Sequence, residues 1–232
     1  MDGYTEFAKF YDSAMGDRAA DVATVRDLLQ RYYPTARSVL ELGCGTGVLL
    51  KYFINDGFHV AGVDSSGDML AIARERLPGA HLVQQDIRSF SLEDKYDAIL
   101  CLFDTINHLP TFQDWRVTFS QAALYLKEEG VFIFDINTED KLKRLASAPA
   151  YRKELDGKVI TMKVTAKEGV YNWHTEVVEK GISESKPLVS EDILEVSFPI
   201  SSVEKALNEY FSEVYIINQG IGTGRAYFVC KK

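Results

Sequence analysis

Glycine occupies every second position in one short segment of the sequence. Glu41 is followed by Gly43, Gly45 and Gly47, directly after a β-rich apolar run. Glycines let backbone amides approach a ligand closely, and a helix that starts there offers unpaired N–H donors. A dinucleotide-binding GxGxxG loop, counted from Gly43, needs a third glycine where Val48 stands. The segment therefore has the form ExGxGxG, and a nicotinamide-binding loop is the less favoured alternative.

Short β-rich runs alternate with helical segments on both sides of this loop. Residues 4–33 have the pattern of two helices that divide near Gly16. Strands are expected at 38–42, 59–64, 81–86, 96–102 and 131–136, with helices between them. Capping-box patterns predict helices that begin near Ser65 and Ser201. This alternation predicts a parallel sheet with helices on both faces.

The pattern changes to period two after about residue 150. Apolar side chains alternate with polar ones in three runs, at Ile160, Met162 and Val164, at Tyr171, Trp173 and Val177, and at Leu194, Val196 and Phe198. Such alternation predicts an antiparallel sheet with one covered face. The last two strands, 213–218 and 226–231, are joined too closely for a crossover helix and must be antiparallel. We expect three segments: helices and an α/β core (1–149), an inserted sheet (150–199), and a helix and hairpin that complete the core (200–232).

Four ordered motifs resemble those of the class I S-adenosylmethionine-dependent methyltransferases of the bacterial small-molecule type. VLELGCGTG matches the first motif, VAGVDSSGDML the second, QQDI the third and YDAILCL the fourth. The resemblance covers residues 38–135, and the final hairpin shares its topology. It implies an α/β, doubly wound Rossmann-like sheet of seven strands, the last antiparallel, with an inserted small antiparallel β-sheet. It also implies S-adenosyl-L-methionine as cofactor and S-adenosylhomocysteine as product.

The resemblance assigns cofactor contacts to the matching positions. Asp64 would accept hydrogen bonds from both ribose hydroxyls, Asp86 from the adenine amino group, and the Ile87 amide would meet a ring nitrogen. The first helix resembles one that covers the cofactor, which would place Tyr11 near the methionine end. The full set of residues expected at the cofactor is Tyr11, Glu41, Gly43, Cys44, Gly45, Gly47, Asp64, Ser65, Met69, Asp86, Ile87 and Leu102.

The acceptor is expected beyond the carboxyl ends of the strands, where open α/β sheets bind ligands. The resemblance places the segment after the fourth strand beside the transferring methyl group, so Asp104 and Asn107 would bind the acceptor. Tyr171 and Trp173 would contribute from the inserted sheet, which would cover the acceptor site. His108 is the candidate general base because histidine titrates near neutral pH, and a hydrogen-bonded loop histidine is the plainer alternative. We expect no metal, since no cluster of acids follows the fourth and fifth strands.

Composition restricts the classes of partner. The net charge of −8 disfavours nucleic acid, and a short basic group is interpreted as a solvated helix face: Lys141, Lys143, Arg144, Arg152 and Lys153. No apolar stretch approaches the roughly 18 residues of a membrane span, the first residues lack a secretory pattern, and the three scattered cysteines favour a cytoplasmic location. We therefore expect methyl transfer to nitrogen or oxygen of a small molecule. A nicotinamide-dependent oxidoreductase, a catalytically idle cofactor-binding module and a homodimer stay open.

Overall fold

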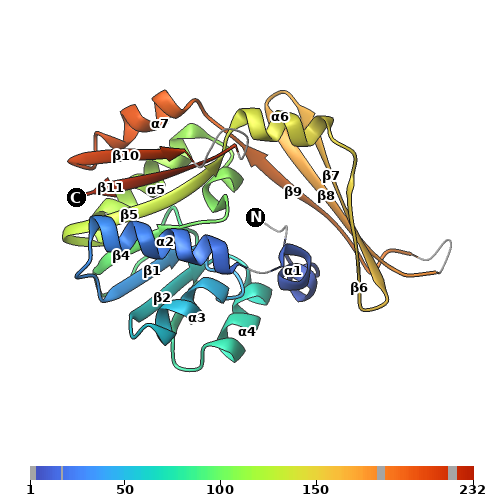
Figure 1. Cartoon of the computed structure of the whole chain (residues 1–232), viewed down its shortest axis with the longest axis horizontal. Coiled ribbons are helices and arrows are strands. Elements are labelled where there is room, and N and C mark those ends of the chain that lie inside the picture. The colour runs from blue at the N-terminus through green and yellow to red at the C-terminus, as the bar shows by residue number, and fades with distance from the viewer. Residues whose placement is uncertain (1–3, 17, 182–185, 219–223) are drawn as a thin grey trace.

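Two separate β-sheets organise the molecule, as the computed structural model in Figure 1 shows. The structure describes residues 4–16, 18–181, 186–218 and 224–232. The helices are α1 (Ala8–Met15), α2 (Ala19–Tyr32), α3 (Val48–Asn55), α4 (Gly67–Arg76), the 3-10 helix η1 (Thr105–His108), α5 (Phe112–Tyr125), α6 (Glu139–Ser147) and α7 (Ile200–Leu207). The strands are β1 (Ser38–Leu42), β2 (His59–Asp64), β3 (His81–Gln84), β4 (Tyr96–Cys101), β5 (Leu126–Asn137), β6 (Tyr151–Leu155), β7 (Lys158–Lys167), β8 (Val170–Glu179), β9 (Val189–Val196), β10 (Glu213–Asn218) and β11 (Arg225–Lys231).

The larger sheet has seven strands in the order β10-β11-β5-β4-β1-β2-β3. Strands β1 to β5 pair in parallel, whereas β11 lies antiparallel between β5 and β10. The order reverses between β1 and β4, and such a switch point opens a crevice at the carboxyl ends of the strands. The predicted fold class is thereby confirmed, including the antiparallel last strand.

Helices cover both faces of the larger sheet because its central strands are apolar on both sides. On one face Phe132 and Phe134 pack with Trp115 of α5 and with α7. On the other face Val131 and Ile133 pack with the apolar sides of α2, α3 and α4. The alternation of neighbouring residues between two buried clusters is the pattern of a doubly wound sheet.

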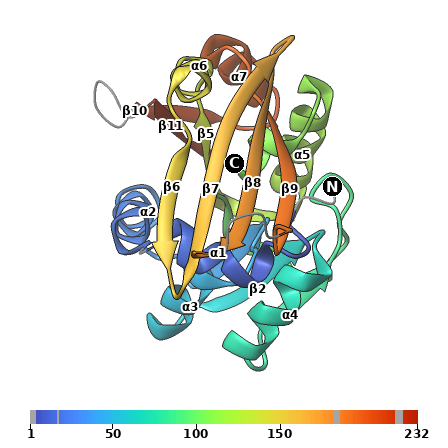
Figure 2. The same cartoon turned by 90° about the vertical axis from the view of Figure 1, so that its right-hand side faces the viewer.

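The smaller sheet consists of β6-β7-β8-β9, all antiparallel, and faces the core across α1 (Figures 1 and 2). Its covered face carries Ile160 and Val177, which pack with Phe7 at the start of α1. In β9 the predicted phase is wrong at Leu194, which is 55% exposed while Ile193 is buried, whereas Val196 is buried as predicted. The buried side chains of β9 are Val189, Ile193, Glu195 and Val196, and they include an acid.

Two predicted helix starts need correction. Ser66, not Ser65, caps α4, and its hydroxyl accepts a hydrogen bond from Met69 N at 3.2 Å. Helix α7 begins at Ile200 after Pro199, so Ser201 already lies inside the helix. The predicted basic helix face is also divided, since Lys153 lies on β6 and donates to Ser13 O of α1 at 2.7 Å. None of the described helices is long and apolar enough to cross a membrane.

Candidate active site

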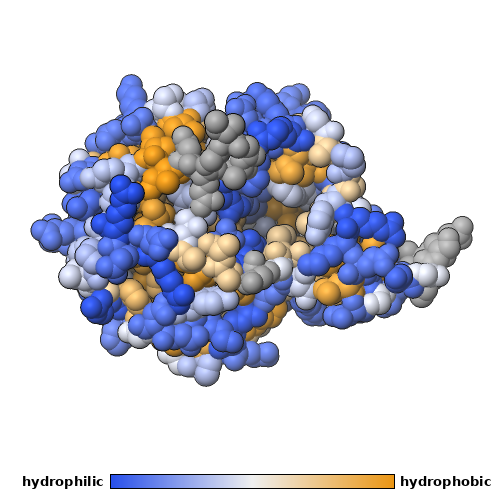
Figure 3. Space-filling view, viewed as in Figure 1, coloured by the Kyte–Doolittle hydropathy of each residue, from blue (hydrophilic) through white to orange (hydrophobic). Residues whose placement is uncertain are grey.

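A pocket of about 500 Å³ lies between the carboxyl ends of the core strands and the smaller sheet. The space-filling surface is hollowed between these two parts (Figure 3). The described residues that line the pocket are Tyr4, Tyr11, Gly43, Gly45, Asp64, Ser65, Ser66, Met69, Asp86, Ile87, Phe103, Thr105, Asn107, His108, Pro110, Val170, Asp192, Ile193, Leu194, Glu195 and Val196. Its volume lies within the usual range for a site that encloses a small ligand.

The glycine loop forms one wall of the pocket, and its backbone has a conformation that residues with side chains rarely adopt. Gly43 and Gly45 have φ angles of +72° and +51°. A Cβ atom on Gly43 would lie 2.3 Å from Thr105 Cγ2, so the loop must pass close to η1. A Cβ atom on Gly45 would meet no protein atom within 4 Å, and Gly45 lines the pocket. The loop therefore leaves a cradle that a ligand can fill.

Asp64 ends β2 directly beside this loop. Its Oδ2 accepts a hydrogen bond from Gly45 N and its Oδ1 one from Ser66 N, both at 2.8 Å. Burial raises the pKa of the Asp64 carboxyl, although these two amide donors favour its charged form. An ionised carboxylate offers about four acceptor positions, so Asp64 keeps lone pairs for a ligand.

Asp86 and Ile87 lie on the same wall, after β3. The carboxylate of Asp86 is held by Arg88, whose Nε lies 2.9 Å from Oδ1 and whose Nη2 lies 2.6 Å from Oδ2. This hydrogen-bonded ion pair lowers the pKa of Asp86, and Arg88 is itself fixed by Asp114 at 3.0 Å. The acid is thus kept charged and oriented at the pocket wall.

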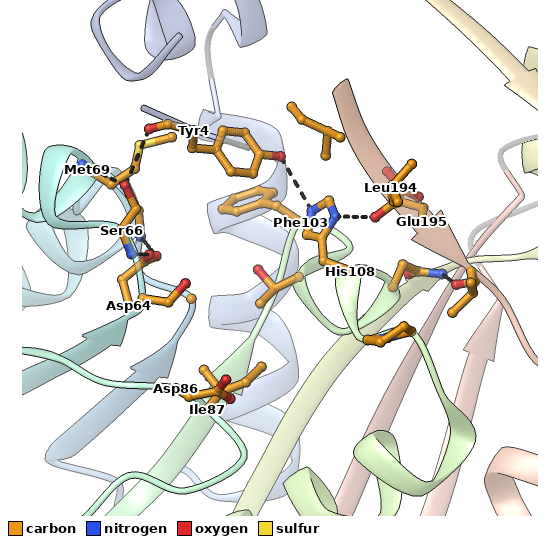
Figure 4. Close-up of a pocket in the computed structure, with 18 of the residues that line it drawn as sticks. Tyr4, Asp64, Ser66, Met69, Asp86, Ile87, Phe103, His108, Leu194 and Glu195 are labelled. Carbon is orange, nitrogen blue, oxygen red and sulfur yellow. Dashed lines mark hydrogen bonds between the residues drawn. The ribbon is translucent and has the colours of Figure 1, made fainter. Parts of the chain in front are cut away.

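His108 stands between this wall and the smaller sheet (Figure 4). Its Nδ1 lies 3.1 Å from Leu194 O, and because a backbone carbonyl only accepts, Nδ1 carries the proton. Its Nε2 lies 3.4 Å from Tyr4 Oη. Burial raises the pKa of the Tyr4 hydroxyl, which stays protonated and donates. Because Nδ1 carries a proton, Nε2 is the nitrogen of His108 that can act as a base.

An ion network fixes the turn between β4 and η1. Phe103 and Asp104 have φ angles of +58° and +57°, which is unusual for two consecutive residues that are not glycine. Asp104 pairs with Arg225 of β11, and its backbone N donates to Asp135 Oδ1 at 3.2 Å. Burial raises the pKa of Asp135 to about 6, against the effect of Arg225 at 2.9 Å. The strained turn is thus held by residues outside the pocket.

Glu195 is a pocket acid that the sequence analysis did not single out. It is 3% exposed, and its Oε2 accepts a hydrogen bond from Asn137 Nδ2 at 2.9 Å. Burial, followed by the nearby charge of Asp104, raises the pKa of Glu195 well above its ordinary value. A glutamate in phase with Val189 and Ile193 on the covered face of a strand is the signal that would have found it.

The structure brings most of the predicted cofactor residues together. The predicted residues that line the pocket are Tyr11, Gly43, Gly45, Asp64, Ser65, Met69, Asp86, Ile87, Asn107 and His108. Those that do not line it are Glu41, Cys44, Gly47, Leu102, Asp104, Tyr171 and Trp173. Tyr171 instead packs against Leu142 of α6, because both complete a small buried cluster.

Several residues that line the pocket were not predicted from the sequence, because only the tertiary structure brings them together. Tyr4 precedes α1, and Asp192 to Val196 reach the pocket from β9, across the gap between the two sheets. Ser66 and Phe103 are each next to a predicted residue, so a wider reading of the same motifs would have included them.

Helix α1 is fastened to both sides of the pocket. Asp12 accepts a 2.7 Å hydrogen bond from Thr46 Oγ1 of the glycine loop and pairs with Arg76 of α4. On the other side, Glu191 Oε1 of β9 accepts a hydrogen bond from Glu6 N at 2.7 Å. The segment that carries Tyr4 and Tyr11 thus links the core to the smaller sheet over the pocket.

Comparisons with known proteins agree with this geometry. Residues 39–130 match the family model of a methyltransferase domain. Over 126 residues the chain is 35% identical to a dTDP-3-amino-3,4,6-trideoxy-alpha-D-glucopyranose N,N-dimethyltransferase from Streptomyces venezuelae, covering 54% of this chain and 53% of that protein. The matched part of the chain thus spans about half the length of the curated relatives.

Two solved structures match nearly the whole chain. DesVI from Streptomyces venezuelae has a TM-score of 0.82 and 27% identity, over 97% of this chain and 95% of that one. CalS10, an amino pentose methyltransferase from Micromonospora echinaspora solved with S-adenosylmethionine bound, has a TM-score of 0.82 and 24% identity, over 98% and 97%. Residues 39–130 thus match a methyltransferase domain, and nearly the whole chain shares its fold with these two solved structures.

Proposed function

We propose that this protein transfers the methyl group of S-adenosylmethionine to a nitrogen atom of a small molecule. The observation that carries the proposal is the pocket in which Gly45, Asp64 and Asp86 meet at the switch point of the sheet. The relative from Streptomyces venezuelae is named as an N,N-dimethyltransferase, which supports nitrogen as the methylated atom.

The pocket wall formed by the core fits a nucleoside with an amino acid tail. In this proposal Asp64 accepts hydrogen bonds from the ribose hydroxyls, while Asp86 and the amide of Ile87 meet the adenine. The methionine portion lies over the cradle at Gly45, below Tyr11. Carboxylates, an amide and a side-chain-free loop are the groups that such a ligand requires.

Five predicted residues would act on this ligand indirectly. Glu41 and Cys44 are buried and support the loop from within the core, and Leu102 is buried beside the strained turn. A Cβ atom on Gly47 would lie 2.7 Å from Leu77 Cδ1, so this glycine is needed for packing against α4. Asp104 pairs with Arg225 and so holds the turn.

The protein itself needs to contribute little covalent chemistry to this reaction. The cofactor supplies a methyl carbon that is activated by its positively charged sulfur. The chain binds and orients the acceptor and keeps water away, which Tyr4, Tyr11 and Phe103 do as pocket walls. Transfer to an amine releases one proton from nitrogen, and His108 Nε2 is placed to accept it.

Calorimetric titration tests the cofactor assignment. We expect S-adenosylhomocysteine to bind with a dissociation constant in the micromolar range or below, and NAD not to bind. Asp64→Ala should weaken that binding by about 1.5–3 kcal/mol, the usual contribution of a hydrogen bond to a charged group. Asp94→Ala, at an exposed position outside the pocket, is the matched control and should bind normally.

Other outcomes point to the alternatives. Binding of NAD but not of S-adenosylhomocysteine would favour an oxidoreductase. Tight binding of S-adenosylhomocysteine without its release from S-adenosylmethionine, across a panel of amine and hydroxyl acceptors, would favour an idle binding module. A cytoplasmic location stays a prediction, supported by three buried cysteines without disulfides.

A further inference from the structure

Among the described residues that line the pocket, every charged side chain is acidic. These residues are Asp64, Asp86, Asp192 and Glu195, and among the described lining residues there is no lysine or arginine. The segments outside the described residues, 1–3, 17, 182–185 and 219–223, contain no lysine or arginine in the sequence either. The charge that a ligand meets here therefore comes from carboxylates.

The acids fall into two groups on opposite sides of the pocket. Asp64 and Asp86 lie on the core wall and have ligand roles in the proposed function. Figure 4 shows Glu195 across the pocket from Asp64, with His108 between them. Glu195, together with Asp192, comes from β9 and is not needed for a nucleoside on the core wall.

The basic side chains of the nearby network are already engaged. Arg225 pairs with Asp104 and Asp135, and Lys141 donates to Asn137 Oδ1 at 2.6 Å. Neither of these two cations lines the pocket. Asp192 is more than half exposed and bonds His174 at 2.9 Å, so Glu195 is the acid that dominates this side.

This arrangement discriminates between acceptors by their charge. A phosphate or carboxylate group would lose its hydration and meet carboxylates instead of a cation, which is unfavourable on both counts. Burial raises the pKa of Glu195, so an ammonium group beside it would favour its ionised form and gain a charged partner. The Phe103 ring already carries the Arg18 guanidinium at 4.3 Å, so Tyr4 and Tyr11 are the rings left to add cation–π attraction. The neighbouring Pro110, Ile193, Leu194 and Val196 offer apolar contacts.

We propose that the acceptor is an aliphatic or alicyclic amine that is bound as a cation and carries neither a phosphate nor a carboxylate group. This inference rests on the proposed function, whose acceptor class it names. The ammonium group binds beside Glu195. The Tyr4 hydroxyl releases His108 Nε2, which takes one proton of the ammonium group. The nitrogen lone pair then forms the new N–C bond, and the C–S bond breaks with its electrons going to sulfur.

A divalent metal is the other cation that this corner of the pocket could attract. Asp104, His108 and Glu195 each offer a ligand atom, and these atoms lie within 4.8 Å of one another. However, Asp104 is paired with Arg225, and His108 Nδ1 is used by Leu194 O. An organic cation needs only the carboxylate of Glu195, so we favour an organic cation. Binding that depends on a metal is one of the outcomes that the test below distinguishes.

The test compares ligands of matched shape on protein saturated with S-adenosylhomocysteine. Cyclohexylamine, cyclohexanol and cyclohexanecarboxylate are titrated by calorimetry at mildly alkaline pH in the presence of EDTA, with thymidine diphosphate as a nucleotide probe. We expect the amine to bind at least about tenfold more tightly than the alcohol, the effect of one charged hydrogen bond. The carboxylate and the nucleotide should not bind.

Two variants show whether Glu195 is responsible. Glu195→Gln keeps the shape and should reduce the preference for the amine over the alcohol to near unity. Glu154→Gln, at an exposed position of β6 outside the pocket, should keep it. A tenfold preference that survives Glu195→Gln, tighter binding of the carboxylate or nucleotide, or binding that requires added manganese would each overturn the proposal. Failure of S-adenosylhomocysteine to bind at all would instead refute the proposed function.

Discussion

Gly45 shows most simply how one residue specifies a ligand site. Its positive φ angle is strained for any other L residue, yet a Cβ atom there would touch no protein atom within 4 Å. Packing within the protein therefore does not explain the glycine. Its amide donates a hydrogen bond to Asp64, and Gly45 lines the pocket. We therefore infer that the space a side chain would fill at this position is left for a ligand.

A pair of glycine variants separates ligand contact from backbone strain. Gly45→Ala and Gly57→Ala both force alanine to a positive φ angle in open space, since a Cβ atom on Gly57 would also meet no protein atom within 4 Å. Both should lower the free energy of unfolding by about 1–2 kcal/mol. Only Gly45→Ala should weaken S-adenosylhomocysteine binding, by about 1–3 kcal/mol from overpacking. If the two variants bind S-adenosylhomocysteine with equal affinity in calorimetry, the ligand does not contact the glycine loop.

At the scale of elements, α1 is a cover whose position depends on a few polar contacts. It is eight residues long and has no side-chain cap, so its order comes from packing on the smaller sheet and from Asp12. The Arg76 guanidinium also donates to Thr46 O at 2.5 Å, so α4, the glycine loop and α1 are joined at one point.

Removing this joint should loosen α1 without unfolding the core. In Arg76→Met the apolar stem remains but the ion pair with Asp12 is lost. We expect faster amide hydrogen exchange in α1 and faster dissociation of S-adenosylhomocysteine. Arg74→Met, on the exposed side of the same helix, is the control and should behave like the parent protein. Identical exchange in both variants would mean that packing alone holds α1.

At the scale of the whole molecule, one buried side chain joins the two sheets. Asn107 Nδ2 donates to Asn137 O of β5 at 3.0 Å and to Val196 O of β9 at 2.7 Å. Its Oδ1 accepts from Asn137 N at 2.9 Å. The amide is fully used within the protein, so we infer that Asn107 sets the width of the pocket, while acceptor binding by it stays a prediction.

Asn107→Ala should therefore be costly for the fold. It removes the Asn107 partner of two buried backbone groups, Val196 O and Asn137 N, while Asn137 O keeps a 2.8 Å hydrogen bond from Ser197 Oγ. Each lost partner is worth about 1–3 kcal/mol, so we expect a loss of about 2–5 kcal/mol in the free energy of unfolding. Denaturant titration measures it. Asn208→Ala, which removes an exposed hydrogen bond in α7, should change stability by less than about 0.5 kcal/mol. A comparably small change for Asn107→Ala would show that the sheets are not joined there.

The sequence predicted those parts of the molecule that depend on local pattern. The ExGxGxG loop, Asp64 and Asp86 follow strands with clear periodicity, and the structure places Gly45 and both acids on one pocket wall. The opposite wall depends on how β9 meets the core. Leu194 and Glu195 stand in a strand where apolar residues occur in both phases, so local alternation assigned the wrong face. The three-segment division of the chain stays a prediction.

The central claim is that the core wall of the pocket binds S-adenosylmethionine. A crystal structure of the protein with S-adenosylhomocysteine tests it most directly. We predict ribose hydroxyls within about 2.5–3.2 Å of the Asp64 carboxylate, adenine beside Asp86 and Ile87, and the homocysteine tail over Gly45. The account would be contradicted by density for the ligand outside this pocket, or by a ribose that is turned away from Asp64.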